Sequence, residues 1–95
     1  MPPHYRAITK SVAFRLNAPH AKHVSVVILS AKGDKTSTRG MRKAVDGVWH
    51  ATVDLPRGRW LYRLLVDNVP ILDPLSRGTV KDEAGAEWSM REVGH

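Results

Sequence analysis

The chain has 95 residues, 42% of them hydrophobic, which predicts one globular domain and argues against intrinsic disorder. It has no cysteine, which excludes disulfides and thiolate chemistry, and its fifteen Lys and Arg against nine Asp and Glu give a net charge of +6. No apolar run reaches the ~18 residues that a membrane-spanning helix needs, and the N-terminus lacks the apolar core of a signal peptide. We therefore expect a cytoplasmic protein that has no membrane association.

Alternation of apolar and polar residues, the pattern of a strand with one buried face, recurs along the chain. It predicts six or seven short strands, of which six can be placed: 11–17, 23–30, 41–45, 49–55, 60–66 and 87–93. The strand at 23–30 carries apolar residues on both faces, which indicates a central strand that is covered on both sides or by a loop. No stretch combines a helical apolar period with helix caps.

Turn and loop signals separate these strands. Residues 1–10 are interpreted as a lead-in, because Pro2-Pro3 opposes regular structure. Asp46-Gly47 is a strong hairpin signal, and a short loop around Gly58 predicts a second hairpin, between strands 49–55 and 60–66. The polar stretches 31–40 and 75–85 are expected to be loops.

Short strands at this spacing predict an all-β fold, an antiparallel sandwich of about seven strands. We expect residues 11–95 to form a single domain. The side chains expected to face its core are Val12, Phe14, Leu16, Val24, Val26, Ile28, Trp49, Val53, Tyr62, Leu64 and Val66.

Signals for catalysis are few. The five histidines lack the spacing of a metal site, and no G-x-S-x-G nucleophile motif is present. Asp67 and Asp73 could form a carboxylate pair, but we interpret both as turn residues that accept hydrogen bonds from backbone N–H groups. The sequence therefore predicts no catalytic residues, no metal and no cofactor, and we expect the protein not to be an enzyme.

The positive charge is spread along the chain. The densest basic group lies between Lys32 and Lys43, and a second one runs from Arg57 to Arg63. We interpret these residues as solvated loops and strand faces, so a nucleic-acid partner is unlikely, although Arg59-Trp60 and Tyr62-Arg63 do place aromatic beside basic residues.

Four segments carry a resemblance to a known family. They are VAFRLNAPHAKHVSVV at 12–27, DGVWHATVDLPRGRWLYRLLVDN at 46–68, LDP at 72–74 and DEAGAEWSMREV at 82–93. In this order and spacing they resemble the glycogen-binding module of the AMP-activated protein kinase β subunit. More broadly, they are similar to the early-set domains that precede the barrel in isoamylases and glucan-branching enzymes, carbohydrate-binding module family 48. The resemblance implies an immunoglobulin-like sandwich that binds α-glucan.

The sugar-binding positions that the resemblance implies are only partly kept. The family's two stacking tryptophans correspond to Gly33 and Pro70, its lysine corresponds to Arg63, and its asparagine falls near Trp88. One of the four positions is therefore chemically similar, and most of the aromatic stacking is missing.

We expect a relocated carbohydrate-binding site to be formed by Arg63 and Trp88, together with Trp60. Trp49 alternates in step with core residues, and Trp60 lies on the same strand face as Tyr62 and Leu64, so Trp49 is expected in the core and Trp60 in the core or at the end of the sheet. Two placements stay open for Trp88: it covers the edge of the core, or it offers an exposed platform.

The sequence thus leaves two function classes open. One is a non-catalytic α-glucan-binding module with a degenerate, weak site. The alternative is a protein–protein interaction module on the same early-set scaffold, since a fold does not determine a function. The expected partner is accordingly an α-glucan polysaccharide or a protein, and the oligomeric state stays open.

Overall fold

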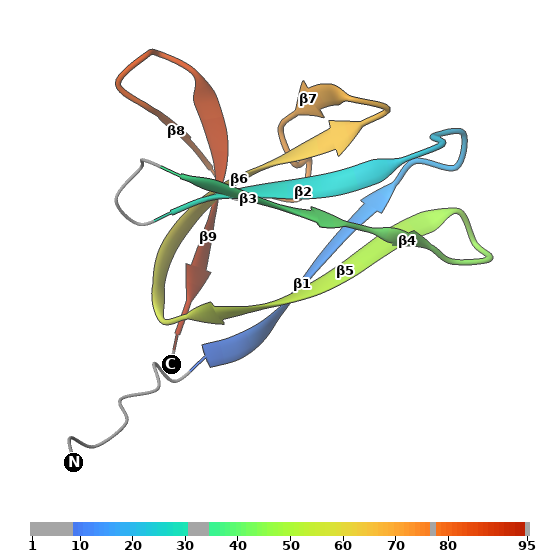
Figure 1. The fold of residues 1–95 in the computed structure, drawn as a ribbon, viewed down its shortest axis with the longest axis horizontal. Helices are drawn as coiled ribbons and strands as arrows, with labels where there is room; N and C mark the ends of the chain where they lie inside the picture. The colour runs from blue at the N-terminus through green and yellow to red at the C-terminus, as the bar shows by residue number, and fades with distance from the viewer. Residues whose placement is uncertain (1–8, 31–34, 77, 95) are drawn as a thin grey trace.

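The computed structural model describes residues 9–30, 35–76 and 78–94, and every regular element in these ranges is a β-strand (Figure 1). The strands are antiparallel and form two sheets that pack against each other. The predicted all-β, immunoglobulin-like sandwich is therefore confirmed, and the described ranges contain nine strands instead of about seven. No helix in the described ranges is long and apolar enough to cross a membrane.

The first sheet has three strands in the order β1-β5-β4. They are β1 (Thr9–Asn17), β5 (Val48–Pro56) and β4 (Arg42–Lys43). The predicted lead-in at 1–10 lies outside the described residues except for the first two residues of β1.

The second sheet has the order β3-β2-β6-β9-β8, and β7 also pairs with β6. Its strands are β3 (Thr36–Gly40), β2 (Val24–Leu29), β6 (Gly58–Val66), β9 (Glu87–Val93), β8 (Thr79–Lys81) and β7 (Val69–Ile71). The central place predicted for the strand at 23–30 is confirmed, because β2 lies between β3 and β6.

The core lies between the two sheets and consists of the inward-facing residues of each strand. Ten of the eleven predicted core residues are buried, Val66 is half-buried, and Met41, Leu55 and Val93 join them. Phe14 of the first sheet meets Tyr62 of the second edge to face, with ring centroids 4.8 Å apart. Burial of each such large side chain contributes ~1.5–3 kcal/mol to the free energy of unfolding.

The predicted hairpin between the strands at 49–55 and 60–66 is wrong. β5 pairs only with β1 and β4, whereas β6 pairs with β2, β7 and β9, so the chain passes from one sheet to the other at Arg57 and Gly58 (Figure 1). Gly58 has a φ of 141°, a backbone conformation that residues with a side chain rarely adopt. In the sequence, a short link that contains glycine between two half-buried strands is compatible with a hairpin and with a crossing between sheets. The two cases differ only in which strands β5 and β6 pair with.

Two stretches expected to be loops contain strands. Residues 36–40 form β3, which pairs with β2 along its whole length although all five side chains are exposed. Residues 79–81 form β8, which pairs with β9. Both are edge strands held by backbone hydrogen bonds, so they need no apolar face and leave no alternation in the sequence. The strand expected at 41–45 is shorter than predicted, since β4 has two residues.

Two tight turns join neighbouring strands. The predicted Asp46-Gly47 turn is present: the Gly47 N–H donates to the Ala44 carbonyl at 3.0 Å, and Gly47 has a φ of 85°. A further hairpin joins β6 to β7 through Asp67 and Asn68, whose φ values of 49° and 69° fit the two positive dihedrals of a type I′ turn.

Candidate functional site

The outer face of the second sheet carries the side chains that point away from the core. On β6 the core side chains Tyr62 and Leu64 are fully buried, so the intervening Leu61, Arg63 and Leu65 face outward. Antiparallel pairing sets Leu61 opposite Leu29 of β2 and Met90 of β9. An apolar row therefore crosses three strands of this face, and each member is half-buried.

Arg63 and Trp88 lie together at the centre of this face. The Arg63 guanidinium carbon is 3.8 Å from the centroid of the Trp88 ring, which is a cation–π contact. Arg63 Nε donates to the Glu87 carbonyl at 3.0 Å, which fixes the plane of the guanidinium. The other N–H donors of Arg63 have no partner among the described residues, and they are available to a ligand.

The Trp88 ring is held from its other end by Asp82. Trp88 Nε1 donates to Asp82 Oδ2 at 2.9 Å, and the backbone N–H groups of Ala84 and Ala86 donate to Asp82 Oδ1. The hydrogen bond from Trp88, followed by the one from Ala86, holds the pKa of the Asp82 carboxyl below its ordinary value. The β8–β9 hairpin thus keeps the indole in one orientation beneath Arg63.

Of the three predicted sugar-site residues, two lie together and one does not. Trp88 is only 6% exposed and is covered by Arg63, so its face is not an open platform. Trp60 lies on the opposite face of the sheet, half-buried against the core, and its Nε1 donates to the Pro56 carbonyl at 2.8 Å.

Of the two positions that correspond to the family's stacking tryptophans, the structure describes one. Pro70 is exposed on β7 and sits opposite Leu65 of β6, so it shares a face with Arg63. Gly33 lies outside the described residues.

Sequence reasoning missed the apolar surroundings of Arg63. Val27 and Leu29 of β2 face outward and are half-buried, although no layer of the described chain covers them. The signal was present, because a strand with apolar residues on both faces indicates that both faces are covered. What the sequence did not reveal is that the outer face lies open.

The two aspartates considered as a catalytic pair are turn residues, as interpreted from the sequence. Asp67 Oδ1 accepts hydrogen bonds from the backbone N–H groups of His23 and Lys22. These bonds, the one from His23 above all, lower the pKa of the Asp67 carboxyl below its ordinary value. Asp73 Oδ1 accepts the Leu75 N–H at 2.9 Å. Among the described residues, no group of three His, Cys, Asp or Glu side chains could hold a metal ion.

Comparison with solved structures places the fold beside that of pullulanases. A pullulanase from an Anoxybacillus species, complexed with maltotriose, superposes with a TM-score of 0.68 at 22% identity, over 90% of this chain and 12% of that chain. The apo pullulanase from Paenibacillus barengoltzii gives 0.60 at 26% identity over 83% of this chain and 13% of that one. The pullulanase of Group B Streptococcus superposes with a TM-score of 0.62 at 22% identity, over 83% of this chain and 12% of that chain.

The chain thus spans about an eighth of the length of these enzymes. No curated protein sequence matches it. The sequence model of carbohydrate-binding module 48, the isoamylase N-terminal domain, matches residues 3–76, which is most of the chain. The nine-stranded sandwich with Arg63 and Trp88 on its outer face therefore belongs to carbohydrate-binding module family 48.

Proposed function

We propose that this domain is a non-catalytic α-glucan-binding module whose sugar site is centred on Arg63. The observation that carries the proposal is the stacked pair of Arg63 and Trp88 on an uncovered sheet face, in a chain of a carbohydrate-binding family. Arg63 stands where the resemblance expects a sugar-binding lysine, and Trp88 stands near the expected asparagine.

In this proposal Arg63 contacts the sugar and Trp88 positions Arg63. The Nε of Arg63 is already bonded to Glu87, so its terminal N–H groups are left to donate to glucan hydroxyls. The planar guanidinium can also lie against a sugar ring, as it does against the indole beneath it. Leu61 and Leu65, on either side of Arg63 along β6, offer apolar contact to the C–H groups of neighbouring sugar units.

The same geometry supports weak binding. A few aromatic or arginine anchors usually carry most of the affinity of a shallow site. Here the Trp88 face is occupied by Arg63, and Pro70 stands in place of one stacking tryptophan. One anchor therefore remains where the family pattern has several, and we propose that the site is degenerate.

Co-sedimentation with insoluble amylose tests this function, with cellulose as the β-linked control. We expect a fraction of the protein to pellet with amylose and none with cellulose, and Arg63→Ala to abolish the difference. Arg59→Ala is the matched control, since Arg59 lies on the same strand, is exposed, and only pairs with Glu92 at 3.6 Å. Equal pelleting with both polysaccharides, or no loss in Arg63→Ala, would count against the proposal.

A protein-interaction module is the second candidate, and the apolar row of Leu29, Leu61 and Met90 favours it. Half-buried apolar side chains on an uncovered sheet face are typical of a surface that contacts another domain or protein. Leu61→Lys should then abolish capture of a partner from the host lysate while leaving the melting temperature unchanged. A partner captured equally by both forms would place the contact on another face.

A further inference from the structure

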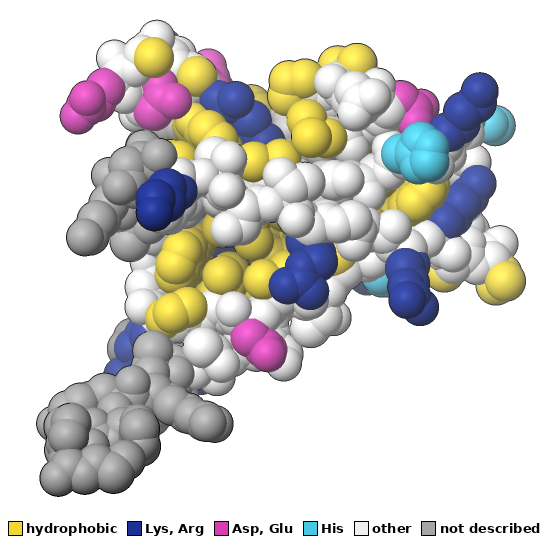
Figure 2. Space-filling view, in the orientation of Figure 1, with side chains coloured by type: hydrophobic (Ala, Val, Ile, Leu, Met, Phe, Trp, Pro, Cys, Tyr) yellow, Lys and Arg dark blue, Asp and Glu magenta, His cyan; other side chains and the backbone are white. Residues whose placement is uncertain are grey.

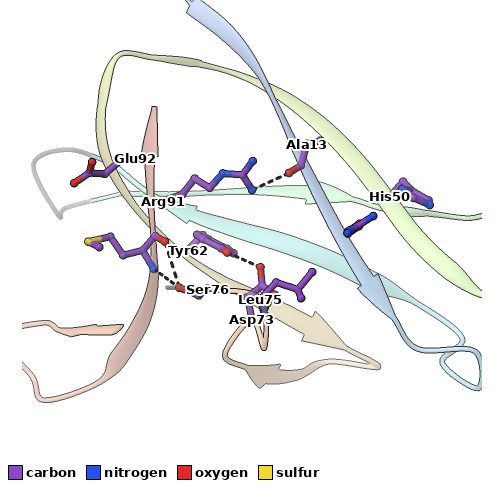
Figure 3. A pocket seen from close by; sticks show the side chains of 10 residues that line it. Ala13, His50, Tyr62, Asp73, Leu75, Ser76, Arg91 and Glu92 are labelled. Atoms are coloured by element: carbon purple, nitrogen blue, oxygen red, sulfur yellow. Dashed lines mark hydrogen bonds between the residues drawn. The ribbon is translucent and has the colours of Figure 1, made fainter. Parts of the chain in front are cut away.

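A groove lies at the seam between the two sheets, and Arg63 and Trp88 are not among the residues that line it (Figure 3). Its volume is about 830 Å³, within the ~300–1,000 Å³ typical of small-ligand sites. Strands β1 and β9 form its two edges, and the Arg91 side chain bridges them by donating to the Ala13 carbonyl at 2.9 Å. His50 of β5 lies at one end of the groove and Glu92 at the other (Figure 3).

Two arginines, one histidine and two carboxylates line this groove, and they differ in how far their hydrogen-bonding groups are already occupied. Both carboxylates are engaged: Asp73 accepts the Tyr62 hydroxyl and the Leu75 N–H, and Glu92 pairs with Arg59. The basic groups are less occupied. Arg15 and His50 line the groove and make no hydrogen bond or ion pair with another described residue.

Strand register gathers the basic groups into a row. Arg15 of β1 is opposite His50 of β5, and His50 is opposite Arg42 of β4. All three are exposed on the outer face of the first sheet, and directly opposed side chains on neighbouring strands have Cβ atoms ~4.5–5.5 Å apart. The nearest same-face neighbours along β1 and β5 are uncharged: Ala13, Asn17, Val48 and Thr52. The carboxylate on this face of β5, Asp54, is four residues from His50 and accepts the Ser11 hydroxyl.

We propose that this groove binds a phosphate-bearing hexose, either free or as a unit of a phosphorylated glucan. The phosphate lies on the Arg15–His50 lip, because a guanidinium matches the geometry of phosphate oxygens with two parallel hydrogen bonds. The sugar lies further in, where the free donors of Arg91 meet its hydroxyls and the exposed Leu75 meets its C–H groups. The choice of hexose rests on the proposed carbohydrate-binding function, whereas the anion site depends only on the charges described above.

An NMR titration with glucose 6-phosphate tests the site. We expect saturable shifts of backbone amides in β1 and β5 and of the His50 ring, and a much weaker response to glucose or inorganic phosphate alone. Arg15→Gln and His50→Gln should each weaken binding by about tenfold, the loss expected for one charge-assisted hydrogen bond. Arg39→Gln is the matched control, since Arg39 is exposed on β3 and does not line the groove, and its affinity should stay unchanged.

Several results would overturn this inference. They are the absence of saturation, equal binding by Arg15→Gln, inorganic phosphate binding as tightly as the sugar phosphate, and glucuronate binding equally well, which would make the ligand a carboxylate. A phosphorylated starch that binds more tightly than the monomer would support the polymer as the source of the hexose. Maltoheptaose distinguishes this groove from the glucan site at Arg63. If maltoheptaose fails to bind while glucose 6-phosphate binds, the proposal for Arg63 is wrong and the proposal for the groove is supported.

Discussion

Asp73 shows at the scale of one residue how the fold uses a buried charge. It is 8% exposed, its Oδ2 accepts the Tyr62 hydroxyl, its Oδ1 accepts the Leu75 N–H, and its own N–H donates to Ser89 Oγ at 2.8 Å. A buried charge is tolerated only when such bonds replace its hydration. The Asp73-Pro74 turn is therefore tied to the middle of β6 and β9.

Tyr62→Phe should destabilise the domain by ~1–3 kcal/mol, because it leaves one oxygen of the buried Asp73 without a partner. Burial, with Asp73 next to it, raises the pKa of the Tyr62 hydroxyl. The folded state then keeps this proton while the unfolded state releases it near pH 10, so stability is lost as the pH rises above that value. Denaturant unfolding at pH 8 and pH 11 should show that the parent loses more unfolding free energy between these two pH values than Tyr62→Phe does. Equal losses in the two proteins would contradict the linkage to the Tyr62 proton.

Trp49→Ala should lower the free energy of unfolding by ~3–5 kcal/mol. That is a large part of the ~5–15 kcal/mol by which a typical domain is stable. Trp49 is 7% exposed, and its Nε1 donates to the Ala18 carbonyl at 2.9 Å. Val45→Ala is the control, since Val45 is fully exposed and its loss removes no packing. A melt of Trp49→Ala that coincides with the parent's would contradict the core assignment.

The elements themselves show how far sequence patterns reach. Alternation located β1, β5, β6 and β9, because each has one face in the core, and an apolar run on both faces located β2. It could not locate β3 or β8, whose side chains are mostly solvated, and it could not tell which strand pairs with which. Pairing depends on contacts that are distant in sequence, so the crossing from β5 to β6 was mistaken for a hairpin.

Two glycines test the crossing between the sheets. Gly58 and Gly40 both have open space where a Cβ would lie, but only Gly58 has a positive φ, at 141°. Gly58→Ala should therefore destabilise the domain by ~1–3 kcal/mol through backbone strain alone, and Gly40→Ala should be nearly neutral. Chemical denaturation of the two variants checks this; equal stabilities would mean that the crossing does not depend on the glycine.

At the scale of the whole molecule the charge is unevenly placed. Lys, Arg and His side chains gather at the right-hand end in Figure 2, over the loop between β1 and β2 and over β4, while acidic side chains cluster at the β8–β9 hairpin. The sequence showed the excess of +6 but not this separation, because residues far apart in the chain meet at one end.

Nucleic acids should be attracted to this basic end only through non-specific electrostatics. We expect weak binding to duplex DNA that collapses between ~50 and 200 mM salt, since each phosphate contact releases a counterion. Fluorescence anisotropy over a salt series measures this. Sequence-selective binding that survives physiological salt would instead make the protein a nucleic-acid binder.

The sequence could reveal the direction of the side chains in the candidate site but not the contacts between them. The outward direction of Arg63 followed from its alternation with Tyr62 and Leu64. Its stacking on Trp88 did not, because that contact depends on the register of β6 against β9 and on the bond from Trp88 to Asp82. Trp60 lies on the core side of β6, as expected from the strand face that it shares with Tyr62 and Leu64.

An NMR titration with maltoheptaose tests the central claim, that Arg63 on its Trp88 support binds α-glucan. The account predicts weak, saturable binding, with a Kd on the order of 1 mM, and shifts centred on the Trp88 indole N–H and on the amides of β6 and β9. Arg63→Ala should abolish these shifts while Arg59→Ala retains them, with both variants folded. No response at millimolar sugar, or a response that is unchanged in Arg63→Ala, would contradict the claim.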